Sequence, residues 1–353
     1  MTRASSIILP PLGALYGAIT ETRLALYRRG ILNISRLDAP VISIGNITTG
    51  GTGKTPLVEY IARALAAEGR QVCILTRGYG RQNQKARVLV SDAQKVLAGE
   101  KEAGDEPFLL AENLQGIAAV ISDADRFAAG QWAIRELGSE VFILDDGFQH
   151  LRLARNLNVA MIDATNPWGD GQLLPRGRLR ERRGGLARAD CILITRADQA
   201  EDVESLRGEL DKVSNHRPLF TSVMRVRGLR KFDQPLPTNA ARAKPEIEPP
   251  VAAFCAIGNP GAFMDQIRNA GYELVGASVF PDHHRYDQRD VGSIIEKARK
   301  EGAKSLITTA KDAVKLRGLA FDFSCYVLDI EIRIDDESRF KEMIRAAIAS
   351  KLR

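Results

Sequence analysis

Short apolar, β-branched runs alternate with longer stretches of helical periodicity through the first two hundred residues of the chain. This alternation is typical of parallel strands joined by helices, and it predicts an α/β fold with a doubly wound parallel sheet. A helical period also begins at Pro56 and continues to Ala67. The predicted strands are VISI at 41–44, VCILT at 72–76, AAVI at 118–121, VFILD at 141–145, VAMID at 159–163 and CILIT at 191–195.

A polar, proline-rich segment without periodicity occupies 226–250 and indicates a linker between two domains. The first domain is then 1–225, and a second, smaller α/β domain is predicted at 251–334. A helical stretch within 335–353 could fold back on the first domain. The strands predicted for the second domain lie at 251–257, 273–280, 305–309 and 325–332, with helices near 261–270 and 290–301.

The N-terminus contains an uncharged apolar stretch from Ile7 to Ile19, followed by several arginines. It is interrupted by Pro10 and Pro11 and is too short to span a bilayer, for which a helix needs about 20 residues. Two interpretations stay open. The segment is either an amphipathic element that lies in the membrane interface or a first helix packed on the core.

Composition narrows the possible classes of protein and of partner only moderately. The 353 residues are 44% hydrophobic, enough for two cores, and the four cysteines lie in or beside strand-like runs, as expected for buried thiols in a reducing compartment. No Cys/His cluster has zinc-ligand spacing. The net charge of +6 points to anionic partners, but no nucleic-acid module is present and nothing indicates an obligate protein partner.

The segment GNITTGGTGKTP at 45–56 follows the first strand directly and precedes the predicted helix. Its glycines let backbone N–H groups face phosphate, Lys54 would reach the β- and γ-phosphates, and Thr55 would hold Mg²⁺. Thr48 stands where the strict P-loop pattern has glycine. This context predicts a P-loop NTPase-like fold. The expected nucleotide-binding residues are Thr48, Thr49, Gly50, Gly51, Thr52, Gly53, Lys54 and Thr55.

The segment Thr195–Asp198 bears on the choice of nucleotide, because it loosely imitates the base-reading [NT]KxD motif of GTPases. Arginine replaces the lysine of that motif. We interpret the segment as a capped turn, and ATP is favoured over GTP.

Three acidic groups follow predicted strands or begin predicted helices. Asp145 and Asp146 end a hydrophobic strand, where a P-loop fold places its Mg²⁺-holding acid. Asp105 and Glu106 are either a helix cap or functional. His283 shares a turn with an acid and could hydrogen-bond a carboxylate across a cleft between the domains, tuning it as a general base.

Together these motifs resemble the tetraacyldisaccharide 4′-kinases of lipid A biosynthesis. The resemblance covers nearly the whole chain, and its specificity comes from the order and spacing of the motifs. The matching segments are GNITTGGTGKTP, LTRGYGR at 75–81, GDEP at 104–107, DDGFQH at 145–150, GDGQLLPRGRLRE at 169–181, FPDHHRY at 280–286 and TTAKDAVK at 308–315.

The resemblance implies a function: transfer of the ATP γ-phosphate to the 4′-hydroxyl of a tetraacylated glucosamine disaccharide 1-phosphate, forming lipid IVA. The reaction would take place at the cytoplasmic face of the inner membrane, on whose anionic surface the protein is peripheral or monotopic. Arginines clustered between 176 and 188 suit both a lipid phosphate and that surface.

The resemblance also implies roles for individual residues. Catalysis is assigned to Asp105 acting with His283, together with Asp146 and Lys54. The metal would be held by Thr55, Asp145, Asp146 and Glu106, and the site would be supported by His150, Arg180 and Glu181.

One departure from the family pattern is visible at Ala310, where glutamate is usual, so any role of that glutamate is in doubt here. Two other functions compete with the kinase. A partitioning-type ATPase usually has lysine before the double glycine, where this chain has Thr49. A soluble small-molecule kinase would not need residues 1–22.

Overall fold

The computed structural model describes residues 3–232 and 247–350 and forms two compact units. The first unit comprises Met1–Arg77, Val120–Val223 and Ile332–Arg353, and the second comprises Gly78–Ala119 and Met224–Glu331. Gly78–Ala119 therefore belongs to the second unit, although the sequence pattern places it in the first domain. The predicted linker at 226–250 overlaps a strand that ends at Lys231, and its residues 233–246 lie outside the described residues.

Five parallel strands form the centre of the first unit, in the order β7-β6-β1-β5-β2. Every residue in these strands is buried, which explains why their sequences are continuous apolar runs without alternation. β8 (Leu219–Lys231) pairs in parallel with β7. The five strands are β1 (Val41–Asn46), β2 (Val72–Thr76), β5 (Val141–Leu144), β6 (Leu157–Asp163) and β7 (Cys191–Thr195).

Helices connect and cover these strands. α5 begins after the cap Asp125, whose side chain accepts from Ala128 N, and ends at left-handed Gly138. The C-terminal helix, α10, belongs to the first unit, where Phe340 packs edge-on against Phe220. The helices of this unit are α1 (Arg3–Arg28), α2 (Lys54–Ala67), α5 (Arg126–Leu137), α6 (Val203–Val213), α10 (Glu337–Ala349) and the short 3₁₀ turns η1 (Gly169–Gly171), η2 (Arg183–Arg188) and η3 (Ala197–Gln199).

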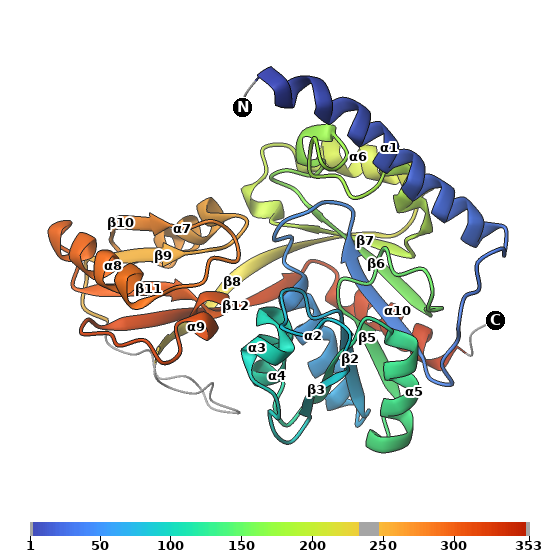
Figure 1. Ribbon diagram of the computed structural model, residues 1–353, viewed down its shortest axis with the longest axis horizontal. Coiled ribbons are helices and arrows are strands. Elements are labelled where there is room, and N and C mark those ends of the chain that lie inside the picture. Colours follow the sequence, from blue (N-terminus) through green and yellow to red (C-terminus); the bar gives the residue numbers. More distant parts are fainter. Residues whose placement is uncertain (1–2, 233–246, 351–353) are drawn as a thin grey trace. The chain divides into compact units, whose positions relative to one another are not determined.

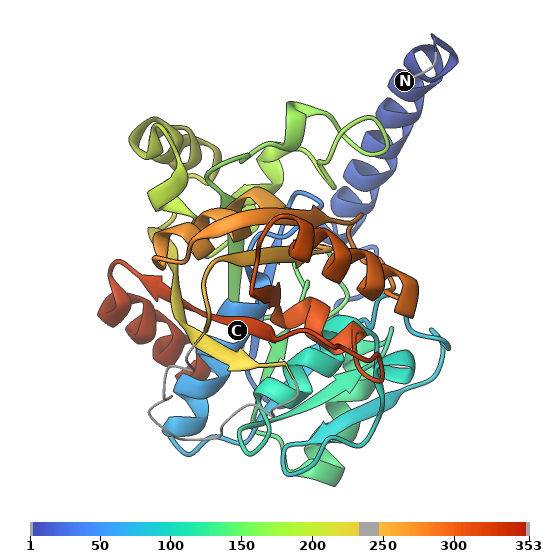
Figure 2. The same cartoon turned by 90° about the vertical axis from the view of Figure 1, so that its left-hand side faces the viewer.

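The first helix, α1, contacts its unit through a narrow stripe. Gly13 and Gly17 are buried against Leu173, and the Tyr16 hydroxyl donates to the Arg180 carbonyl over 3.0 Å. A Cβ at Gly17 would lie 2.7 Å from Leu173 Cδ1, so a side chain there would require Leu173 to shift. Figures 1 and 2 show α1, in dark blue, running along the outside of the first unit.

The other face of α1 is apolar and exposed. Leu12, Leu15 and Ile19 recur at helical spacing and are 43%, 58% and 59% exposed. Within the described residues, no helix has the length and apolarity needed to cross a membrane. The exposed face shows that α1 is not a fully packed core helix.

The second unit contains a parallel sheet in the order β10-β9-β11-β12, and these strands overlap the four ranges expected for the second domain. α8 begins with a capping box between Asp287 and Asp290 and buries an apolar stripe on this sheet. β4, β8 and β12 each continue from one unit into the other. The remaining elements are β3 (Val88–Asp92), α3 (Glu100–Ala103), α4 (Asp105–Asn113), β4 (Ala118–Ser122), β9 (Val251–Cys255), α7 (Pro260–Asn269), β10 (Leu274–Val279), α8 (Gln288–Lys300), β11 (Ser305–Thr309), α9 (Ala310–Lys315) and β12 (Cys325–Ile334).

Candidate active site

The glycine-rich loop joins β1 to α2 in the first unit. Gly53 caps α2 with a φ of 82°, and Gly50 has a φ of 122°, both in the region that favours glycine. Lys54, the first residue of α2, donates to Asn46 Oδ1 over 3.2 Å and lies 3.6 Å from Asp146 Oδ1. The loop thus presents a lysine and a helix N-terminus, which together suit a phosphate group.

A distant segment pairs with the first half of this loop. Thr49 N donates to Arg178 O over 2.7 Å, and Arg180 N donates to Ile47 O over 2.7 Å. Thr48 forms an antiparallel bridge with Leu179. Its backbone is therefore extended, a conformation that any residue can adopt. This pairing explains why threonine can replace the glycine of the strict motif, and it places Arg180 beside the loop.

The segment after β7 supports the loop from another side. Thr195 Oγ1 donates to Thr52 O over 3.1 Å, and Arg196 Nη2 donates to Gly51 O over 2.6 Å while its other nitrogen pairs with Asp163. The predicted turn is present as η3, but its predicted cap is wrong, because no side-chain hydrogen bond caps the turn at Arg196. These residues instead hold two carbonyls of the phosphate loop in place.

Two carboxylates follow β5, the strand next to β1. Asp145 is buried and accepts from Thr76 Oγ1 over 3.3 Å, whereas Asp146 accepts from Arg180 Nη1 over 2.8 and 2.7 Å. Burial alone would raise the pKa of Asp146, but the charges of Lys54 and Arg180 hold it below its usual value of 3.8. Asp146 is therefore ionised at neutral pH.

The backbone of Asp146 has a φ of 50°, a left-handed conformation that is costly for a residue with a side chain. The loop that follows is held by partly buried Arg155, which donates to Gly147 O over 3.2 Å and to His150 O over 2.8 Å. These bonds stabilise the strained turn. Sequence reasoning missed Arg155, because nothing local to DDGFQH signals a guanidinium under the loop.

His150 lies in the same loop and is partly buried beside Arg126, whose Nη1 is 3.4 Å from its Nδ1. Burial, reinforced by the positive charges of Arg126 and Arg155, lowers the pKa of His150 to about 3. His150 is therefore neutral at physiological pH and can act there as a hydrogen-bonding group but not as a cation.

Glu181 belongs to the same arrangement. It forms an ion pair with Arg188, and its Oε1 accepts from Gln149 Nε2 over 2.6 Å. Several arginines of the 176–188 cluster are thus engaged within the protein, since Arg182 also pairs with Glu21. Arg176 and Arg178 are exposed.

The other predicted catalytic residues, Asp105 and His283, lie together in the second unit. Asp105 begins α4, and its Oδ2 is 3.5 Å from His283 Nδ1. Both residues belong to the same unit, so this contact is not one between domains. Burial would raise the pKa of Asp105, but the hydrogen bond from His283 and the charges of Lys315 and Lys311 hold it below 3.8.

Glu106, the neighbouring residue in α4, is ion-paired with Lys311 over 3.2 Å. The structure therefore groups Asp105, Glu106 and His283 in one unit, and Lys54, Thr55, Asp145 and Asp146 in the other. The assignment of Glu106 as a metal ligand remains a prediction.

The residues of the first unit fit a nucleotide with Mg²⁺. A side chain at Gly50 or Gly51 would meet no atom within 4 Å, and the buried Thr52 hydroxyl has no hydrogen-bond partner among the described residues, so the loop has space and an unused polar group for a ligand. Thr55, Asp145 and Asp146 offer the oxygen ligands that Mg²⁺ prefers. In the described part of the chain, no group of three or more His, Cys, Asp or Glu could hold a metal ion. A Mg²⁺ ion bound with substrate phosphates and water does not require such a group.

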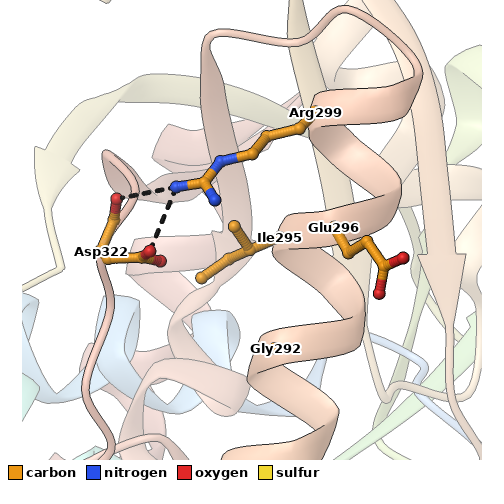
Figure 3. Close-up of a pocket in the computed structure, with 5 residues that line it drawn as sticks. All are labelled: Gly292, Ile295, Glu296, Arg299 and Asp322. Atoms are coloured by element: carbon orange, nitrogen blue, oxygen red, sulfur yellow. Dashed lines mark hydrogen bonds and ion pairs between the residues drawn. The ribbon is translucent and has the colours of Figure 1, made fainter.

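A separate pocket of about 280 Å³ lies against α8 in the second unit (Figure 3). Arg299 and Asp322 point toward each other across it and are joined by a 3.1 Å ion pair. None of the predicted site residues contributes to it. Its lining residues are Gly292, Ile295, Glu296, Arg299 and Asp322.

A glycine-rich loop between a buried parallel strand and a helix, with carboxylates at the end of the adjacent strand, defines a P-loop nucleotide-binding protein. Residues 5–349 match the family model described as tetraacyldisaccharide-1-P 4′-kinase. The chain belongs to this family, which confirms the resemblance drawn from the motifs.

Individual relatives agree with this assignment. The chain is 39% identical to a tetraacyldisaccharide 4′-kinase of Desulfotalea psychrophila over 342 residues, covering 96% of each protein. It is also 39% identical to one from Geobacter sulfurreducens, covering 91% of this chain and 87% of that protein. A crystal structure of LpxK from Aquifex aeolicus in complex with ATP matches with a TM-score of 0.76 and 33% identity, covering 99% of this chain and 100% of that one.

Proposed function

We propose that this protein transfers the γ-phosphate of ATP to the 4′-hydroxyl of a tetraacylated glucosamine disaccharide 1-phosphate, forming lipid IVA. The observation that carries the proposal is the convergence of Lys54 and Arg180 on Asp146 beside the phosphate loop, in a chain of the tetraacyldisaccharide 4′-kinase family. A relative named for this activity matches the chain over nearly its whole length.

Phosphoryl transfer needs mainly charge neutralisation and positioning from the protein. Lys54 would bind the β- and γ-phosphates, with backbone N–H groups of the loop around them. Thr55, Asp145 and Asp146 would hold Mg²⁺, which when bound neutralises charge on the phosphates. Lys54 and Arg180 keep Asp146 ionised, and the hydrogen bonds from Arg180 orient it for this task.

Asp105 would accept the proton of the acceptor hydroxyl, with His283 hydrogen-bonded to it. A carboxylate with a depressed pKa is a weak base, which suits a transition state in which the proton leaves late. Glu106 would contribute to the metal site, and His150 and Glu181 would support the loops around Asp146.

The reaction itself provides the first test. Purified protein incubated with ATP, Mg²⁺ and the disaccharide lipid should yield a product with one additional phosphate at the 4′ position, identified by mass spectrometry and fragmentation. ATP turnover that is indifferent to the lipid would contradict the proposal. Turnover stimulated by DNA or a protein, without a phosphorylated small product, would favour a partitioning-type ATPase instead.

We further propose that α1 associates with the cytoplasmic face of the inner membrane through Leu12, Leu15 and Ile19. Their combined exposure on one helical face, near exposed Arg23 and Arg28, suits an anionic lipid surface. Replacing Leu15 and Ile19 together by aspartate should weaken binding to phosphatidylglycerol-containing vesicles by at least about 10-fold, because apolar burial is lost and charge is added.

Vesicle sedimentation measures this effect. Leu97→Asp, at an exposed leucine of the second unit, is the matched control and should bind vesicles like the wild type. Equal vesicle binding by the α1 variant would favour a soluble kinase whose N-terminal helix has another purpose.

A further inference from the structure

Lys311 lies in the short helix α9. It contacts the segment that contains the predicted base, Asp105, and also the segment that contains its partner, His283. Its Nζ lies 3.2 Å from Glu106 Oε1, 3.5 Å from Asp282 Oδ1 and 3.4 Å from His283 Nε2. The side chain is only 19% exposed. All of these residues belong to the second unit, so their contacts are internal to it.

The chemistry of these groups determines where the proton on His283 lies. A lysine ammonium carries three donors and no acceptor, so in a neutral His283 the ring nitrogen that faces it accepts. Nε2 of a neutral imidazole is then unprotonated, and the proton resides on Nδ1. Nδ1 faces Asp105 Oδ2 at 3.5 Å, where it can donate.

Asp282 would favour the opposite arrangement. Its Oδ2 lies 4.0 Å from His283 Nε2, and its Oδ1 accepts from the backbone N–H of His283 over 3.0 Å. A carboxylate so close to Nε2 attracts a proton to that nitrogen. Lys311 counters this attraction, because its ammonium is ion-paired with Asp282 Oδ1 over 3.5 Å and also faces Nε2 at 3.4 Å.

We propose that Lys311 is a positioning residue that holds His283 in its Nδ1–H tautomer and thereby sets the hydrogen bond that His283 donates to Asp105. The catalytic consequence rests on the proposed function, whereas the tautomer does not. Lysine at position 311 would then act on catalysis through His283.

The tautomer can be observed directly by ¹⁵N NMR of the full-length protein. Protonated and unprotonated ring nitrogens have distinct chemical shifts, the chain has four histidines, and His283→Gln identifies the signal. In the wild type we expect a protonated Nδ1 and an unprotonated Nε2 on His283. A protonated Nε2 in the wild type overturns the proposal without any variant being made.

Variants separate positioning from a general structural effect. Lys311→Met should move the proton toward Nε2, whereas Lys311→Arg, which also only donates, should keep it on Nδ1. Adding Asp282→Asn to Lys311→Met should restore the Nδ1–H tautomer, because the amide can donate to Nε2. An unchanged tautomer in folded Lys311→Met contradicts the proposal.

Kinetics connect the tautomer to the reaction. Lys311→Met should lower kcat by roughly 10- to 100-fold, less than the full contribution of a general base, while the KM for ATP stays unchanged. Lys304→Met, at an exposed lysine of the same unit, is the matched control and should have wild-type kinetics. A tautomer shift without loss of kcat would contradict the catalytic role, and absence of kinase activity in the wild type would instead contradict the proposed function.

Discussion

Lys54→Ala is expected to reduce kcat/KM for ATP by roughly 10³-fold. This is the upper end of the effect expected when an enzyme loses one donor that stabilises the charge developing in the transition state. Lys54 begins α2 directly after the glycine-rich loop, and its ammonium is held between Asn46 Oδ1 and Asp146 Oδ1. Alanine preserves the helix but leaves the phosphates without their nearest cation. It also removes one of the two cations that keep the pKa of Asp146 low.

Steady-state kinetics and calorimetric titration with an ATP analogue measure the two consequences separately. We expect both weaker nucleotide binding and slower turnover, because the lysine would contact the phosphates in the ground state and in the transition state. Lys212→Ala removes an exposed lysine from α6 of the same unit and should leave both quantities unchanged. If Lys54→Ala retained more than a tenth of the activity, the loop would not bind the reacting phosphate.

Asp105→Asn is expected to lower kcat by about 10²- to 10⁴-fold, the usual contribution of a general base. Asparagine keeps the shape of the side chain and can still accept from His283 Nδ1–H, but it cannot take a proton. The nucleotide-binding residues of the first unit are unchanged, so the KM for ATP should stay near its wild-type value. This separation of kcat from KM distinguishes a base from a binding residue.

The pH dependence gives Asp105 a second test. Because its pKa is held below 3.8, the carboxylate is ionised at neutral pH, and activity dependent on it is lost only as the pH falls through that depressed value. Between about pH 6 and 8, protonation of Asp105 should therefore not limit kcat. Asp265→Asn, at an exposed acid of α7, is the control. Nearly full activity of Asp105→Asn would assign the proton to another carboxylate.

The contrast between Asp145 and Arg155 shows how far local patterns reach. Asp145 ends a hydrophobic run, and its place beside the phosphate loop follows from strand order, because parallel strands bring their carboxyl ends to one edge. Arg155 lies several residues later and has no local signature. Its contact with the carbonyls of Gly147 and His150 exists only once the loop has folded over it.

The division into two units also shows which features local sequence patterns predict and which they do not. The apolar runs predicted β1, β2, β5, β6 and β7 closely, since strands buried on both faces must be continuously apolar. Strand β3 was missed, because only two of its five residues are buried and the apolar run is therefore weak. Membership of Gly78–Ala119 in the second unit depends on which surfaces pack together, and no local periodicity reports that.

The sequence by itself determined the parallel α/β architecture, the phosphate loop around Lys54, the acids at 145 and 146 and the family. These features follow from burial periodicity and from residues adjacent in the chain. Only the tertiary structure decided that Arg180 binds Asp146, that Arg196 holds Gly51 O, and that Lys311 faces His283. Such contacts join polar groups 28 to 145 residues apart, and their partners are selected by the geometry of the folded chain instead of by spacing along it.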